Sequence, residues 1–279
     1  VTPMSEMICS TCMYHCRLKA GQTGKCRVRK HVNGRIICGN YGKITSLALD
    51  PIEKKPLKRF HPGSHILSVG SYGCNLSCPF CQNHEISMKT EEEVQSVYVS
   101  PQSLCEKALQ LVPYGNIGVA FTYNEPMIGY EYVRDTARCC REEDLKTVVV
   151  TNGSVFLEAA AEVMPLIDAW NIDLKGFTDE YYRKLGGSLD MVKEFIREAV
   201  RHGHVELTTL IVPGENDSDG EMEALAAWVS SVSPEIVLHV TRFFPNWKMT
   251  DRGPTDVNQV YHLAQIAGRH LKYVYTGNC

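Results

Sequence analysis

The chain has 279 residues, of which 44% are hydrophobic and 22% are charged, and these values are ordinary for a globular protein. A net charge of −3 and a pI near 6.4 give no electrostatic reason to expect nucleic-acid or membrane partners. No apolar run approaches the roughly 20 residues that span a bilayer, and the N-terminal residues lack the apolar core of a signal peptide. We therefore expect a cytoplasmic protein that binds neither nucleic acid nor membrane.

Residues 1–64 are predicted to form a small Cys-rich β module and a connector. A cysteine knuckle spans 9–26, and 31–49 follow the pattern of a β-hairpin with a turn at Asn33–Gly34. The connector, 50–64, is basic and rich in proline, so we place the domain boundary after it. Its cations are Lys54, Lys55, Lys58 and Arg59. We expect them to lie in a solvated loop, and the alternative is that they dock a partner protein.

Residues 65–279 alternate short apolar runs with amphipathic helical stretches. Strands are expected at 66–71, 117–122, 147–151, 169–174, 205–212, 236–241 and 272–276. Helices are expected at 101–112, 127–143, 155–164, 178–202 (broken at Gly186–Gly187), 219–231 and 255–270. This alternation predicts parallel βαβ units and an α/β fold, a partial or full parallel (β/α) barrel. In such barrels the chemistry lies at the carboxyl ends of the strands.

Cysteine is the most informative residue of the chain. There are twelve, and seven of them form two tight groups, which in a reducing cytosol indicates metal ligation rather than disulfides. Three others lie in predicted helices and are expected to be packing residues: Cys105, Cys139 and Cys140.

The second group follows the first strand of the predicted barrel. Cys74, Cys78 and Cys81 are spaced C-x3-C-x2-C, and three thiolates this close suit an iron–sulfur cluster. One iron then lacks a protein ligand and can bind the amino and carboxylate groups of S-adenosylmethionine (SAM). A structural zinc ion normally takes four protein ligands, so three cysteines in one loop are a poor zinc site.

This spacing resembles the signature of the radical SAM superfamily. The wider text, DPIEKKPLKRFHPGS, GCNLSCPFCQNHEIS and FTYNEP, is similar to the branch of pyruvate-formate-lyase-activating enzymes, and specifically to the radical SAM member of the AmmeMemoRadiSam systems. The resemblance covers nearly the whole chain and implies the barrel fold, a [4Fe–4S] cluster on the three loop cysteines and SAM as cofactor. It also places Phe80 near the adenine of SAM.

The resemblance implies further SAM contacts at the ends of the second and third strands. Asn124 and Glu125 are expected to bind the amino group of SAM, although this chain has Tyr-Asn-Glu where relatives have a Gly-Gly-Glu-like motif. The alternative is that these two residues cap the helix that starts near Pro126. Thr151 and Asn152 are expected near the SAM carboxylate or ribose, with an ordinary turn as the alternative.

Polar residues on the fourth and sixth strands complete the predicted site. Asp173 and Lys175 are two residues apart on a strand, so both face the barrel interior, where they bind the SAM ribose, its carboxylate or substrate, or form an internal ion pair. His239 and Arg242 are expected to close the site around an anionic or peptide substrate, although a lone histidine at a strand end is more often structural.

The N-terminal knuckle has the spacing C-x2-C-x3-C-x9-C. Its four cysteines are Cys9, Cys12, Cys16 and Cys26. They could hold a structural zinc ion or an auxiliary [4Fe–4S] cluster, with His15 or Cys38 as a substitute ligand. A knuckle without metal is the third alternative. Relatives are expected to continue beyond YVYTGN into a tail, whereas this sequence ends at Cys279, for which no role is predicted.

The sequence thus predicts an oxidoreductase that cleaves SAM reductively and abstracts a hydrogen atom from a substrate. That substrate is either a glycine of a partner protein, as for a glycyl-radical activase, or a small molecule or other protein handled with AmmeMemoRadiSam-type partners. Flavodoxin or ferredoxin is the expected electron donor. A non-catalytic iron–sulfur electron carrier and a zinc-stabilised binding module are the alternative classes.

Overall fold

A computed structural model describes residues 6–279. Its main sheet contains β6 (Ser46–Pro51), β7 (His65–Gly70), β9 (Asn116–Phe121), β10 (Lys146–Thr151), β11 (Ala169–Asp173), β12 (His204–Ile211), β13 (Val237–Arg242) and β14 (Tyr273–Gly277). The strand order is β14-β13-β12-β11-β10-β9-β7-β6, and all neighbours are parallel except the antiparallel pair β6–β7. No pairing joins β6 to β14 within residues 6–279, so the predicted barrel is a partial one.

Helices connect the parallel strands, and most begin where the sequence supplies a cap. They are α1 (His84–Ser87), α2 (Pro101–Gln110), α3 (Tyr130–Glu142), α4 (Leu157–Ala160), α5 (Asp179–Leu185), α6 (Leu189–Ala199), α7 (Asp219–Val232) and α8 (Val257–Ala267). Five start after a Ser, Thr or Asp whose side chain accepts a hydrogen bond from the first turn: Ser100, Thr178, Ser188, Ser218 and Asp256. The predicted break at Gly186–Gly187 is confirmed, because Gly186 has φ +77° and ends α5.

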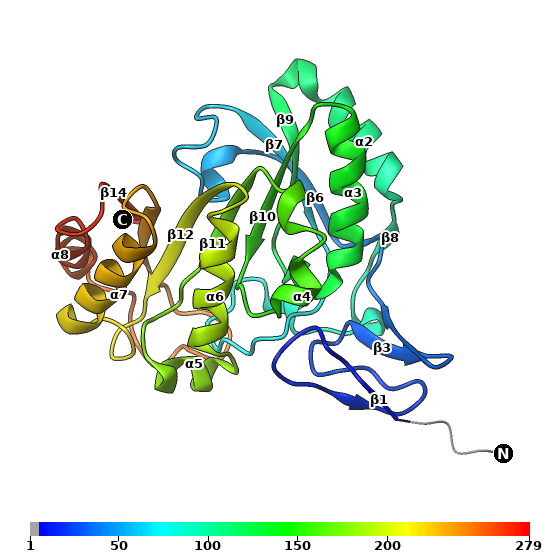
Figure 1. The fold of residues 1–279 in the computed structure, drawn as a ribbon. Helices are drawn as coiled ribbons and strands as arrows, with labels where there is room; N and C mark the ends of the chain where they lie inside the picture. Colours follow the sequence, from blue (N-terminus) through cyan, green and yellow to red (C-terminus); the bar gives the residue numbers. More distant parts are fainter. Residues whose placement is uncertain (1–5) are drawn as a thin grey trace.

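Side chains alternate across the strands and thereby separate a helical face from an inner face. On β11, Trp170 and Ile172 belong to the main hydrophobic core with the helices, whereas Asp173 lines a cavity on the other side. Figure 1 shows α2, α3, α4 and α6 on one side of the sheet. The helices therefore leave the inner face free for the connector and the polar cavity.

Part of the connector packs against the inner face of the sheet. It begins with a 3₁₀ helix, η1 (Ile52–Lys54), and both Ile52 and Leu57 are fully buried against the inner face of β7, β9, β10 and β11. Lys55 is 3% exposed and pairs with Asp50 at 2.8 Å. Of the four cations expected to be solvated, Lys54, Lys58 and Arg59 are exposed. The expectation is wrong for Lys55, because the partial barrel has an open inner face that the connector must cover.

The N-terminal region contains two small hairpins. β1 (Met7–Ile8) pairs with β2 (Arg17–Leu18), and β3 (Arg29–Val32) pairs with β4 (Arg35–Cys38) through a turn in which Asn33 and Gly34 both have positive φ. The predicted hairpin at 31–49 is thus correct only in its first half. The rest of it adds β6 to the main sheet and β5 (Lys43–Ile44), which pairs with β8 (Val97–Tyr98).

The hairpins are anchored to the barrel by an ion pair. The Arg29 guanidinium is 4% exposed and donates two hydrogen bonds to Glu131 of α3, at 2.5 and 2.9 Å. The Tyr14 hydroxyl donates to the Gly186 carbonyl at 2.5 Å.

Because β6 belongs to the main sheet, we propose that the boundary of the N-terminal module lies near residue 45 rather than after residue 64.

The predicted packing role of three cysteines is confirmed. Cys105 and Cys140 are buried in the main core, and Cys139 packs against it. No helix in residues 6–279 is long and apolar enough to cross a membrane.

Candidate active site

The loop that follows β7 carries the three cysteines predicted to bind a cluster. We call residues 71–83 the cysteine loop. It is fixed at several points: the Ser77 amide donates to the Leu185 carbonyl at 2.8 Å, and the Pro79 carbonyl accepts from the Lys248 amide at 2.9 Å. Gly73, with φ +85°, lies so close to the N-terminal module that an added Cβ would be 2.6 Å from the Cys26 carbonyl oxygen. The cysteine loop is therefore held between the module and the barrel.

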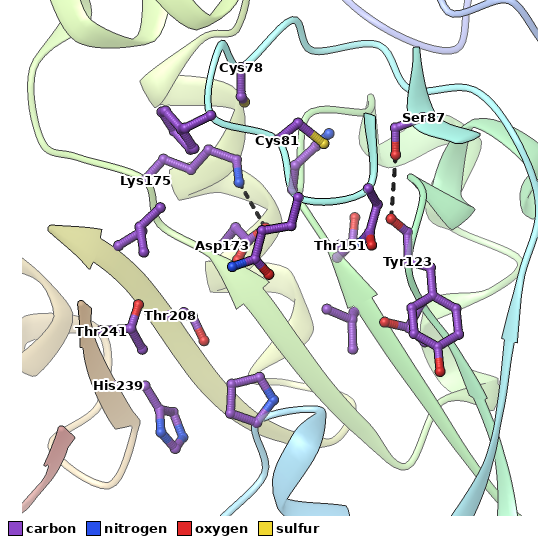
Figure 2. Close-up of a pocket in the computed structure, with 18 of the residues that line it drawn as sticks. Cys78, Cys81, Ser87, Tyr123, Thr151, Asp173, Lys175, Thr208, His239 and Thr241 are labelled. Atoms are coloured by element: carbon purple, nitrogen blue, oxygen red, sulfur yellow. Dashed lines mark hydrogen bonds and ion pairs between the residues drawn. The ribbon is translucent and has the colours of Figure 1, made fainter. Parts of the chain in front are cut away.

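The cysteine loop forms one wall of a cavity of about 700 Å³ at the carboxyl ends of the strands. Figure 2 shows Cys78 and Cys81 on one side of this cavity and Thr208, His239 and Thr241 on the other. The predicted site residues that line it are Cys74, Cys78, Phe80, Cys81, Asn124, Glu125, Thr151, Asn152, Asp173, Lys175 and His239. The volume is in the range of small-molecule sites.

Burial governs the chemistry of the three thiols. It raises the pKa of Cys78 to about 11, partly offset by the charge of Lys175, and it raises the pKa of Cys74 and Cys81 as well. Without a metal these groups are neutral thiols at pH 7, whereas a bound metal ion deprotonates its thiol ligands. Three soft donors on one loop, facing a polar cavity, therefore fit an iron–sulfur cluster.

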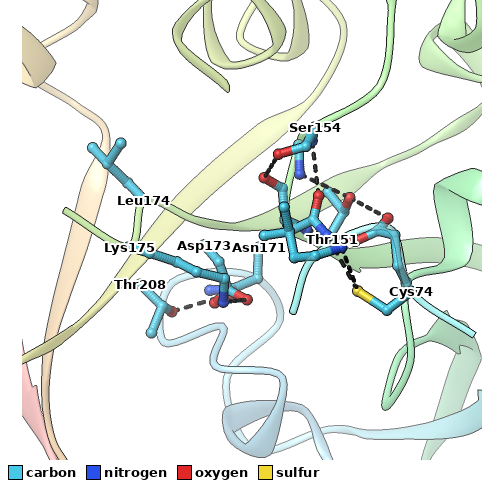
Figure 3. Close-up of polar contacts among 12 residues, drawn as sticks. Cys74, Thr151, Ser154, Asn171, Asp173, Leu174, Lys175 and Thr208 are labelled. Atoms are coloured by element: carbon cyan, nitrogen blue, oxygen red, sulfur yellow. Dashed lines mark hydrogen bonds and ion pairs between the residues drawn. The ribbon is translucent and has the colours of Figure 1, made fainter. Parts of the chain in front are cut away.

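An amide network connects the cysteine loop to the end of β10. The Asn152 side chain donates to the Cys74 sulfur at 3.6 Å and to Asn75 Oδ1 at 3.0 Å, and the Asn75 amide donates to the Ser154 carbonyl at 2.7 Å. Figure 3 shows Cys74, Thr151 and Ser154 in this arrangement. The turn TNGS therefore positions the first cysteine, in addition to lining the cavity.

Glu125 is a buried carboxylate next to this network. It accepts hydrogen bonds from the Thr151 hydroxyl at 2.6 Å, the Asn152 amide at 2.7 Å and the Met127 amide at 2.9 Å. Burial nevertheless raises its pKa to about 7. The capping alternative is confirmed for Glu125, which caps the 3₁₀ helix η4 (Pro126–Gly129), and the contact with SAM stays a prediction.

The two residues before Glu125 have structural roles of their own. Asn124 holds the start of the cysteine loop, because it accepts from the Ser71 amide and donates to the carbonyls of Tyr72 and Gly73. Tyr123 has φ +73°, a conformation that favours glycine, at the position where the motif of relatives is expected to have one. Its hydroxyl donates to Asp50 at 2.8 Å.

Asp173 and Lys175 form the predicted pair on the inner face. Lys175 Nζ lies 2.8 Å from Asp173 Oδ2, and both side chains line the cavity (Figure 2). Burial alone would lower the pKa of Lys175, but the adjacent Asp173 carboxylate raises it well above its ordinary value. The ion-pair alternative is therefore present in the structure, and a ligand contact of the same two groups stays a prediction.

His239 and Arg242 do not act together as expected. His239 lines the cavity, whereas Arg242 is not among the lining residues and donates to the Thr255 carbonyl at 2.7 Å. The two positions are three residues apart on β13, so their side chains point to opposite faces of the sheet. The predicted role of Arg242 in closing the site is thus not supported.

Several lining residues were missed by the sequence analysis. They include hydroxyl-bearing residues at inward positions of β12 and β13, near the end of β14 and in α1: Thr208, Thr241, Thr276 and Ser87. Thr208 lies opposite Asp173 in the register of β11 and β12, and the alternation of the strands would have identified it. Lys58 and Glu53 of the connector were missed because only the tertiary fold brings them to the cavity.

The N-terminal cysteines differ from those of the cysteine loop. Cys9, Cys12 and Cys26 are buried in the module, and burial raises the pKa of Cys12 to about 11. The sulfurs of Cys16 and Cys26 accept hydrogen bonds from the backbone amides of Lys25 and Arg29, at 3.5 and 3.4 Å.

Of the two substitute ligands considered, His15 packs against Phe156 and Cys38 donates to Asn40. Among residues 6–279, no three or more His, Cys, Asp or Glu side chains form a ready site for a single metal ion. The cysteines of a cluster each bind a different iron, so they need not converge as the ligands of one ion do.

This chain belongs to the radical SAM superfamily, whose model it matches over residues 68–228, from β7 to α7. It is 37% identical over 277 residues to "Uncharacterized protein MJ0808" of Methanocaldococcus jannaschii, which covers 98% of this chain and 82% of that one. The chain is therefore an enzyme of a class that uses a [4Fe–4S] cluster and SAM.

Some more distant relatives are named for an activity. The pyruvate formate-lyase 1-activating enzyme of Escherichia coli is 26% identical over 163 residues, which are 55% of this chain and 63% of that enzyme, less than two thirds of its length. A solved radical SAM methyltransferase from Sphaerobacter thermophilus has a TM-score of 0.58 at 17% identity, covering 78% of this chain and 67% of that one.

Streptococcus suis SuiB bound to S-adenosylmethionine has a TM-score of 0.59 at 16% identity, covering 77% and 52% of the two chains. These two structures show the fold alone. The predicted superfamily and the likeness to activating enzymes are confirmed, and the narrower AmmeMemoRadiSam assignment stays a prediction.

Proposed function

We propose that this enzyme cleaves SAM reductively and uses the resulting 5′-deoxyadenosyl radical to take a hydrogen atom from a substrate bound in the same cavity. When bound, a reduced [4Fe–4S] cluster supplies the one electron that breaks the C5′–S bond of SAM and releases methionine. The observation that carries the proposal is that Cys74, Cys78 and Cys81 share one cavity with the polar ends of β9, β10 and β11. Neither the electron-carrier nor the binding-module alternative has support in the comparisons.

The chain's own residues would hold the reactants. Three cysteines are one fewer than the four ligands of a closed cluster, which leaves a coordination position for SAM. The Glu125 carboxylate is held in place by three donors and retains the capacity to accept from the amino group of SAM. Lys175 and Asp173 present opposite charges that suit the carboxylate and the ribose hydroxyls. Phe80 offers a buried aromatic face for adenine.

The test is the formation of 5′-deoxyadenosine. The protein is reconstituted anaerobically with iron and sulfide, reduced with dithionite and given SAM. The products are then separated and identified by mass spectrometry. We expect 5′-deoxyadenosine and methionine from the wild type and none from Cys78→Ala. Cys139→Ala, a cysteine of α3 outside the site, is the matched control and should retain the activity. A wild type that binds iron and SAM but yields no 5′-deoxyadenosine would refute the proposal.

We propose that the N-terminal cysteines hold a second metal centre, either a zinc ion or an auxiliary [4Fe–4S] cluster. Its ligands would be Cys9, Cys12, Cys16 and Cys26. Buried thiols with amide donors directed at their sulfurs support a metal-bound thiolate. Elemental analysis of a variant with Cys74, Cys78 and Cys81 all changed to alanine separates the two forms. Retained zinc would identify a structural ion, retained iron and sulfide an auxiliary cluster, and no retained metal would contradict the proposal.

The electron donor and substrate follow from the same proposal. Radical SAM enzymes need a donor, and we propose reduced flavodoxin or ferredoxin, which would place the enzyme in the cytoplasm. An activase-like role on a partner protein is supported by the likeness to activating enzymes, and action on a small molecule by the likeness to a probable GTP 3′,8-cyclase, 28% identical over 174 residues, which are 59% of this chain and 51% of that enzyme. AmmeMemoRadiSam-type partners would fit either substrate.

A further inference from the structure

A buried tyrosine hydroxyl near the cysteine loop has no hydrogen-bond partner in the fold. Tyr181 of α5 is 3% exposed, and its hydroxyl oxygen is enclosed without a partner among residues 6–279. Buried hydroxyls are normally paired, because an unpaired one loses its hydrogen bonds to water and gains nothing in return. Tyr181 is not among the residues that line the cavity, so a molecule bound there does not account for it.

Helix α5 brings this side chain to the cysteine loop. Leu185, four residues after Tyr181 and on the same face of the helix, accepts at its carbonyl from the Ser77 amide at 2.8 Å. Ser77 directly precedes Cys78. Tyr181 and Leu185 belong with Cys78 and Phe80 to one small hydrophobic cluster, which is separate from the main core. Tyr181 therefore packs with the loop that would hold the iron–sulfur cluster.

The position of the Tyr181 ring is fixed by its surroundings. A β-carbon added to Gly176 would lie 2.5 Å from Tyr181 Cδ1, so only a residue without a side chain admits the ring there. The neighbouring Tyr182 is equally buried, but its hydroxyl oxygen accepts from the Lys175 amide at 3.1 Å. Of two adjacent buried tyrosines, one is paired within the fold and the other is not.

The unpaired hydroxyl is a hydrogen-bond donor beside a metal ligand. Burial, and after it the charge of the Cys78 thiolate, raises the pKa of Tyr181 far above its usual value, so the group keeps its proton. A thiolate that binds iron still accepts hydrogen bonds, and such bonds tune the reduction potential of a cluster. They raise it, because the reduced cluster carries one more negative charge than the oxidised cluster and is stabilised more by a donor.

We propose that the Tyr181 hydroxyl donates a hydrogen bond to the Cys78 sulfur when the cluster is bound, and that this bond raises the reduction potential of the cluster. The inference rests on the proposed function and adds a residue that controls its first step, the uptake of one electron. Tyr181 acts through Cys78 and contacts neither SAM nor substrate.

A potentiometric titration of the reconstituted enzyme without SAM, followed by the electron paramagnetic resonance of the reduced cluster, tests this proposal. Tyr181→Phe should lower the equilibrium constant for reduction at least about threefold, which makes the potential about 28 mV more negative at about 59 mV for each tenfold change. Tyr132→Phe is the matched control. The hydroxyl of this buried tyrosine of α3 donates to the Val99 carbonyl at 2.9 Å, so its removal should leave the potential unchanged. The variant with alanine at all three loop cysteines supplies the signal of an auxiliary cluster, which is subtracted.

A second measurement observes the hydrogen bond directly. In enzyme purified and reconstituted in D₂O, electron–nuclear double resonance should detect a deuteron coupled to the reduced cluster in the wild type and in Tyr132→Phe. That signal should be lost in Tyr181→Phe.

A wild-type potential in Tyr181→Phe, an equal shift in Tyr132→Phe, or an unchanged deuteron signal in Tyr181→Phe would overturn the inference. Reduction of the cluster requires no cleavage of SAM. A shifted potential in an enzyme that forms no 5′-deoxyadenosine would therefore refute the proposed function and support the role of Tyr181. Product formation with no shift would refute only the role of Tyr181.

Discussion

The two ends of the cavity are built from different kinds of structure. At the cysteine end, loop residues present thiols that make long hydrogen bonds, such as the 3.6 Å contact between Asn152 and the Cys74 sulfur. At the opposite end, strand residues are fixed by short hydrogen bonds to a buried carboxylate, such as the 2.6 Å contact between His239 and Glu206. Thiols form strong bonds only when a metal binds them. A hydrogen bond between a carboxylate and an imidazole forms when the chain folds.

Because of this difference, substitutions at the two ends should affect different properties, activity at one end and the free energy of unfolding at the other. Substitutions of the cysteines in the cysteine loop should remove activity at little cost to the fold, because their thiols make few strong contacts of their own. Substitutions beneath the opposite end, in the connector or at Glu206, should destabilise the whole barrel, because these residues fill its inner face. The following variants test that contrast, from the largest expected effect to the smallest.

Cys81→Ala should abolish the formation of 5′-deoxyadenosine, because the cluster loses one of its three ligands. Cys81 is only partly buried, so the free energy of unfolding before reconstitution should fall by less than about 1 kcal/mol. Product analysis and urea denaturation measure the two quantities on the same preparation. A variant that unfolds readily would show that the cysteine end also stabilises the barrel.

Leu57→Ala should lower the free energy of unfolding by about 2–5 kcal/mol, because this fully buried side chain fills the inner face of the sheet. Leu47→Ala on β6 is the matched control, since Leu47 is 44% exposed and should cost little. Urea denaturation gives both values. Equal effects of the two changes would mean that the connector does not pack as described.

Glu206→Gln should lower the free energy of unfolding by about 3 kcal/mol at pH 7, because a pKa lowered from 4.5 to about 2 stabilises the folded state by that amount. The folded-state pKa is the lower one, so this stabilisation is present above about pH 4.5 and disappears as the pH falls towards 2. Denaturation at several pH values should therefore show the wild type and the variant converging in acid. Glu223→Gln, which removes the exposed carboxylate that pairs with His270, should lower the free energy of unfolding by under about 1 kcal/mol at every pH.

Tyr123→Phe should cost about 1.5 kcal/mol, because it removes the hydroxyl that donates to ionised Asp50 and keeps the ring. The left-handed backbone is unchanged by this substitution, so the effect isolates the hydrogen bond. Tyr114→Phe, at a residue 70% exposed, should be neutral. A thermal denaturation midpoint measured for both variants would detect the difference, and no difference would show that the Asp50 contact adds nothing.

Much of the cysteine end could be predicted from the sequence. The spacing of Cys74, Cys78 and Cys81 and the polar residues that follow each predicted strand are local patterns, and parallel strands bring their carboxyl ends to one edge of the sheet. The same patterns predicted the pair Asp173–Lys175 correctly. They failed for Arg242, because grouping residues by their place in the chain ignored the alternation of side chains along β13.

The sequence by itself determined the order of strands and helices and the cysteine spacing, because hydrophobic periodicity and ligand spacing are short-range properties. Only the tertiary structure decided that the connector fills the inner face, that Glu206 lies beneath His239, and that the backbone of Lys58 donates to Glu206. These contacts join residues that are 33 to 148 positions apart. Their strength comes from burial, and burial depends on the whole fold rather than on any segment of it.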